Sequence, residues 1–146
     1  MSRESSKVDP DMAMTKASVM TLEQYCPDMQ TWPERWQFDE HDIAFGHEIV
    51  AFLKPFFLDL LTQGLAVKTL RRHRDCLWLL GGELIRERHE NKQLKKMAVP
   101  QAIAKLIHED GGPLIWPRIT EGEQDSFDAT CRRLYKSLSL RGHPSK

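Results

Sequence analysis

The sequence has few cysteines and no long apolar runs. Its three cysteines, Cys26, Cys76 and Cys131, form no Cys-x-x-Cys pair, which disfavours a disulfide framework and a cysteine-rich zinc site and indicates free thiols. No segment approaches the roughly 18 apolar residues that cross a bilayer, and the N-terminus lacks the apolar run of a signal peptide. We therefore expect a cytoplasmic protein that does not insert into a membrane.

Known catalytic motifs are also missing. The six histidines form no HExxH, and the chain contains no GxSxG, no phosphate-binding loop and no dinucleotide fingerprint. His73 and Cys76 lie three residues apart, but two ligands do not complete a metal site, so a histidine in the core is the favoured interpretation. The sequence predicts a protein with no catalytic activity, cofactor or metal. An enzyme would need a pocket that unites two or more of His73, His89, His108 and Glu109.

The chain carries no net charge, but its charges are unevenly distributed. It has 21 basic and 21 acidic residues, a balance that argues against indiscriminate binding to nucleic acid. Residues 28–48 hold six acidic residues and one basic residue, whereas residues 68–96 hold nine basic and four acidic residues. The two regions, with net charges of −5 and +5, either neutralise each other or form separate faces. The sequence leaves both open.

Apolar residues recur at steps of three and four, which is typical of amphipathic helices. Long helices are expected from Asp42, from Ala66, from Val99 and after the N-cap Thr120, with short helices in the arm before them. Gly64 is placed to end the first long helix in a left-handed conformation. Pro55 predicts a kink in that helix, or its division into two. The sequence predicts an all-α fold, a compact single-domain bundle of about five helices with a flexible N-terminal leader.

Composition divides the chain into four parts. They are a polar leader, an arm rich in aromatic and acidic residues that packs on the body, a helical domain and a loose tail. These parts cover residues 1–19, 20–40, 41–140 and 141–146. In the arm, Trp32 and Trp36 are interpreted mainly as packing residues, with ligand stacking as the alternative.

A cluster of basic residues opens the second long helix. Positive charge at a helix N-terminus opposes the helix dipole, so helix stability does not favour it there. The acidic arm or a phosphate group is the expected partner, since arginine and lysine bind phosphate strongly. An ordinary solvated basic face is the other interpretation. The candidate phosphate-binding residues are Lys68, Thr69, Arg71, Arg72 and Arg74.

The segment "FFLDLL…GLAVKTLRRHRDCLWLLGGEL", within residues 52–86, resembles the start of the core-binding domain of tyrosine recombinases, the phage integrases. The resemblance implies a small SAM-like helical bundle that clamps DNA, with these basic residues and Thr69 on backbone phosphates. It also implies a phage or mobile-element setting. The family's catalytic domain has no counterpart after Pro100, so the resemblance implies a separate binding domain and no recombinase activity.

Two functions follow from these patterns. The first is a non-catalytic helical DNA-binding protein whose basic helix start, residues 68–74, contacts phosphates. The alternative is a protein-interaction or regulatory module that binds a protein partner or a second copy of the chain, as a homodimer. Its contact residues are Trp32, Trp36 and Trp116.

Overall fold

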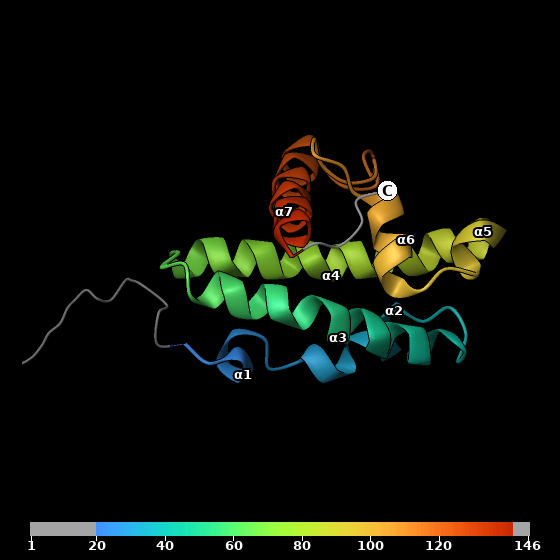
Figure 1. Ribbon diagram of the computed structural model, residues 1–146, viewed down its shortest axis with the longest axis horizontal. Helices are drawn as coiled ribbons and strands as arrows, with labels where there is room; N and C mark the ends of the chain where they lie inside the picture. The colour runs from blue at the N-terminus through green and yellow to red at the C-terminus, as the bar shows by residue number, and fades with distance from the viewer. Residues whose placement is uncertain (1–19, 142–146) are drawn as a thin grey trace, which may run out of the picture.

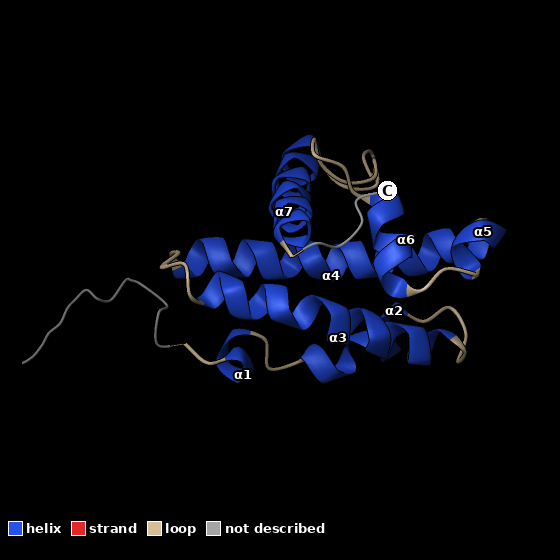
Figure 2. Cartoon of the chain, viewed as in Figure 1, coloured by secondary structure: helices blue, strands red, loops and turns tan. Residues whose placement is uncertain are grey.

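The computed structural model describes residues 20–141, and every regular element within that range is helical (Figures 1 and 2). The all-α bundle predicted from the sequence is confirmed. The leader expected at residues 1–19 and the tail beyond Arg141 lie outside the described residues. The four longer helices are α3 (Asp42–Leu61), α4 (Val67–Glu90), α6 (Val99–Leu106) and α7 (Glu121–Leu140). The shorter ones are α1 (Leu22–Tyr25), η2 (Met29–Thr31), α2 (Trp32–Trp36) and α5 (Lys92–Lys95).

Helices α3 and α4 run side by side and form the centre of the bundle (Figure 1). Helix α7 packs against α4, and the arm that contains α1 and α2 packs along α3. The core residues of these helices form one continuous apolar cluster. In the described part of the chain, no helix combines the length and the apolar character needed to cross a bilayer.

Helix α3 continues through Pro55, so the alternative of two shorter helices is wrong. Pro55 and Ala51, whose carbonyl loses its usual donor, are both exposed, and water can satisfy that carbonyl. Leu53 and Phe56 are buried on either side of the proline, so core packing continues across it. Gly64 has a φ of +69° just beyond the helix, as expected for a left-handed end.

Helix α4 buries one stripe of side chains and exposes another. The buried stripe contains Leu70, His73, Leu77, Leu80 and Leu84, as the three- and four-residue spacing predicted. Gly81 lies where the ring of Trp36 meets the helix, and an added Cβ there would stand 2.2 Å from Trp36 Cζ2. The absence of a side chain at Gly81 thus allows an indole ring of the arm to approach α4 closely.

The chain after α4 differs in detail from the prediction. The connector contains the short helix α5, because the Asn91 side chain accepts hydrogen bonds from the N–H groups of Gln93 and Leu94. Helix α6 ends at Leu106, well before the glycine pair at Gly111 and Gly112. The buried Ile107 adopts an extended conformation. The end of α6 is thus determined by the burial of Ile107, which the glycines do not reveal.

Capping hydrogen bonds define the N-termini of α7 and α1. Thr120 accepts from the N–H of Glu123, and the Glu123 carboxylate accepts from the N–H of Thr120, which forms the capping box of α7. Thr21 and Gln24 form the same arrangement at α1. The predicted N-cap at Thr120 is confirmed, and Glu123 is held beside the first turn of α7.

Candidate functional site

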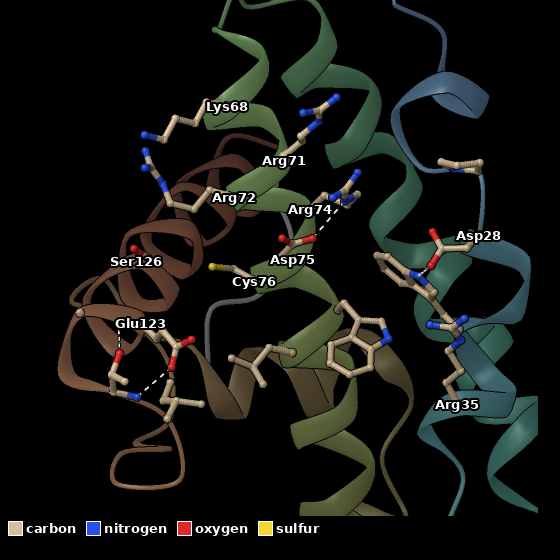
Figure 3. A pocket seen from close by; sticks show the side chains of 17 residues that line it. Asp28, Arg35, Lys68, Arg71, Arg72, Arg74, Asp75, Cys76, Glu123 and Ser126 are labelled. Atoms are coloured by element: carbon tan, nitrogen blue, oxygen red, sulfur yellow. Dashed lines mark hydrogen bonds and ion pairs between the residues drawn. The ribbon is translucent and has the colours of Figure 1, made fainter.

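A groove with a volume of about 1030 Å³ lies along the first half of α4 (Figure 3). Helix α4 forms its floor. One wall comes from the arm, residues 27–35, and the other from residues 119–126 at the start of α7. The groove lies at the upper end of the size range of small-molecule sites, and it unites three segments that are distant in the sequence.

Three basic side chains lie where α4 begins, and a fourth lies farther along the groove on the arm wall (Figure 3). Lys68, Arg71 and Arg72 project from the first turns of α4, and Arg35 projects from α2 on the arm side (Figure 3). All four are exposed. Within residues 20–141, none of them has a hydrogen bond or an ion pair through its side chain. The groove thus presents four cationic groups that the described part of the protein does not neutralise.

The three acidic residues of the groove are already bonded to other groups. Asp75 pairs with Arg74 at 3.1 Å. Asp28 accepts a hydrogen bond from Trp32 Nε1 at 3.3 Å, and Glu123 accepts from the Thr120 N–H at 2.8 Å. Because five basic and three acidic residues line the groove, its net charge is positive even when every carboxylate is counted as ionised.

The structure separates the predicted phosphate-binding residues into two groups. Lys68, Arg71, Arg72 and Arg74 line the groove, whereas Thr69 is half-buried and does not line it. Arg74 also donates to the Tyr25 carbonyl at 3.1 Å and pairs with Asp75. It therefore fastens the arm to α4 and is less available to a ligand than its three neighbours.

His73 does not contribute charge to this basic surface. It is 4% exposed, and its Nδ1 forms a hydrogen bond with Thr130 Oγ1 of α7 at 2.7 Å. Burial, with the nearby Arg133 and Arg72, lowers the pKa of His73 to about 4. The imidazole is therefore neutral near pH 7, and the interpretation of His73 as a core histidine is supported.

The other end of the groove is apolar. Trp78 and Leu79 of α4 face Ile119 at the base of α7. Trp78 is 39% exposed, and no aromatic ring of the described residues stacks on it. Part of Trp78 is therefore accessible to a ligand. Trp78 and Arg35 were missed in the sequence, although Arg71, Asp75 and Trp78 follow the spacing of one helix face.

Asp42, one carboxylate of the acidic region, meets the basic region away from this groove. Asp42, at the start of α3, is 3% exposed and accepts from His89 Nε2 at 2.9 Å near the end of α4. It also accepts from the N–H groups of Phe38 and Asp39, and Arg88 lies 3.9 Å away. One of the six carboxylates of residues 28–48 is thus paired at the end of α4, and residues 68–72 remain uncovered by these contacts.

Asp42 also forms the one cluster of three potential metal ligands within residues 20–141, with Asp39 and His89. Both oxygens of Asp42 lie within hydrogen-bond distance of His89 Nε2, at 3.0 and 2.9 Å. Burial alone would raise the pKa of Asp42, but the bonds from His89, Phe38 and Asp39 outweigh it, and the pKa is lowered. These contacts are those of a structural ion pair.

The cysteines are free and buried, as expected. Burial raises the pKa of Cys26 to about 12, and it also raises the pKa values of Cys76 and Cys131. Thiols with raised pKa values are poor nucleophiles near neutral pH. None of His73, His89, His108 and Glu109 lines the groove.

The three tryptophans proposed to contact a partner lie in different environments. Trp32 and Trp36 are 2% and 5% exposed. Trp32 packs against Trp36 and Phe57, and Trp36 Nε1 donates to the Trp78 carbonyl at 2.9 Å. Their proposed role as partner contacts is therefore corrected, since core packing leaves almost none of either ring exposed. Trp116 is 45% exposed and remains accessible.

No family model, curated protein or solved structure matches the chain. The likeness to integrase core-binding domains stays a prediction from the sequence.

Proposed function

We propose that the chain is a non-catalytic, cytoplasmic DNA-binding protein that holds backbone phosphates in the groove along α4. The observation that carries this proposal is the set of exposed cations, Lys68, Arg71, Arg72 and Arg35, which have no ionic partner within residues 20–141. Lys68 lies in the first turn of α4, where a cation opposes the helix dipole, so helix stability does not account for its position. A bound anion would account for it.

Two further features support a phosphate backbone as that anion. Arginine outnumbers lysine at the site, and the planar guanidinium binds two phosphate oxygens at once. The cations also lie together in one groove, where they can contact neighbouring phosphates of one strand. The integrase-like sequence of residues 52–86 points to the same ligand and to a phage or mobile-element setting.

Removing the free cations of α4 tests the proposal. Replacing Lys68, Arg71 and Arg72 together with glutamine is expected to weaken DNA binding by at least about tenfold, because three charge-assisted phosphate contacts are lost. The measurement is fluorescence anisotropy of short labelled DNA, as single strand and as duplex, at about 50 and about 200 mM salt. The salt dependence is expected to become shallower in the variant.

A matched control separates these contacts from total charge. Replacing Lys92, Lys95 and Lys96 with glutamine removes the same charge from exposed positions that do not line the groove. This control is expected to bind nearly as the parent protein does. Equal losses in both variants, or no binding of either DNA form at low salt, would refute phosphate recognition in the groove.

Protein interaction is the second candidate function, and one observation favours it. Leu114 and Trp116 are 70% and 45% exposed on the loop before α7. Aromatic residues are enriched in interfaces. If this loop joins two copies of the chain, light scattering is expected to show a dimer that Trp116→Ala converts to a monomer. A concentration-independent monomer would exclude self-association through this loop.

A further inference from the structure

The groove changes from basic to apolar along its length, although its floor is one continuous helix. Lys68 and Arg72 lie toward its start, and Trp78 lies toward its other end. Trp78 lies ten residues after Lys68, which corresponds to about 15 Å along the helix axis. A stacked strand advances about 3.4 Å per nucleotide, so the groove is long enough for about four nucleotides.

A paired duplex cannot use the apolar end. In a duplex the phosphates lie outside, and the base faces are stacked on one another within the helix. Trp78, Leu79 and Ile119 are set between the two walls of the groove, where a base can enter only if it is unpaired. A single strand carries both kinds of group that the groove accommodates, anionic phosphates and flat apolar bases.

We propose that the groove binds a single-stranded DNA segment, with phosphates on Lys68, Arg71 and Arg72 and an unpaired base stacked on Trp78. This inference rests on the proposed function and names the form of DNA that the site takes. Arg35, on the arm wall of the same groove, adds a guanidinium that can contact the strand beside that base.

The indole of Trp78 differs from the other tryptophans in ways that suit this role. Trp32 and Trp36 have ring neighbours and are buried, whereas the ring of Trp78 is accessible within a basic groove. Trp116 is also accessible but does not line the groove. It therefore serves as a matched control, since its replacement removes an exposed indole from another part of the surface.

The test compares one labelled DNA sequence of about 16 nucleotides in two forms, as a single strand and as a full duplex. The parent protein is expected to bind the single strand about tenfold more tightly, which is the effect of one stacked base. Trp78→Ala is expected to abolish that preference and to leave duplex affinity within about twofold. Trp116→Ala is expected to change neither value.

Two more variants distinguish stacking from packing. Trp78→Phe keeps an aromatic face and is expected to retain most of the preference, whereas Trp78→Leu keeps apolar bulk and is expected to lose it. Thermal unfolding followed by circular dichroism verifies that each variant is folded. If Trp78→Leu binds single strands as well as Trp78→Phe does, stacking is refuted.

The remaining outcomes separate the two proposals. Equal affinity for single strand and duplex overturns this inference and leaves DNA binding intact. Failure of both DNA forms to bind overturns both proposals. Tighter binding of an RNA strand of the same sequence, or of a poly-glutamate peptide, overturns the assignment to DNA, and the peptide result would identify an acidic protein segment as the ligand.

Discussion

Replacing Gly81 with alanine is expected to destabilise the protein by about 2–3 kcal/mol, even though alanine favours a helix. The new Cβ would lie 2.2 Å from Cζ2 and 2.4 Å from Cη2 of Trp36. The rigid indole has to move, and its hydrogen bond to the Trp78 carbonyl then breaks. Chemical denaturation measures the loss as a lower midpoint with an unchanged slope.

Two variants verify the cause of that loss. Gly122→Ala lies in α7, where an added Cβ meets only Thr120 Oγ1 at 4.0 Å, and it is expected to be neutral or stabilising. Trp36→Leu should make room for a methyl group, so the two changes at positions 36 and 81 should cost less together than their sum. Strict additivity would show that the ring is not the obstacle.

Because α2 also carries Arg35, Gly81→Ala is expected to weaken DNA binding as well.

Replacing Asp42 with alanine is expected to cost about 3–5 kcal/mol of stability, the usual effect of breaking a buried ion pair. Asp42 is 3% exposed and accepts hydrogen bonds from two backbone N–H groups and from His89. All three donors lose their acceptor in the variant. Asp42→Asn keeps one oxygen as an acceptor and is expected to lose less, as unfolding in denaturant near neutral pH will show.

Asp42 also predicts how stability changes with acid. Its pKa in the folded chain is below the ordinary value of 3.8, so the folded state favours the ionised carboxylate. This contribution is complete well above pH 3.8 and is lost as the pH falls through the lowered pKa. Between about pH 6 and about pH 3, Asp42→Asn should lose less stability than the parent protein. An identical loss in both would contradict this assignment.

The fold was largely predictable because most of its helices are determined by residues that lie close together in the sequence. The spacing of Leu70, Leu77 and Leu84 is enough to orient α4, and Thr120 with Glu123 is enough to start α7. The end of α6 was not predictable, since it depends on the burial of Ile107. No pattern within a few residues reports such a tertiary contact.

The groove was only partly predictable for the same reason. The basic residues of its floor are neighbours in the sequence, but Arg35 and Ile119 are 84 residues apart along the chain and line one groove only in the folded protein. The opposed charges of the two regions were visible from composition. That Asp42 meets His89, and that Lys68 stays unpaired within residues 20–141, depends on how α3 lies against α4.

Hydrogen bonds join both the arm and α7 to α4, the floor of the groove. Trp36 Nε1 joins the arm to the Trp78 carbonyl, and the bond between His73 and Thr130 joins α7 to α4. Because these bonds fix the width of the groove before DNA binds, the protein need not rearrange on binding. The protein therefore loses little conformational entropy when a strand binds. Charge at Lys68 and Arg72 should then govern how fast DNA associates, and the indole of Trp78 how slowly it leaves.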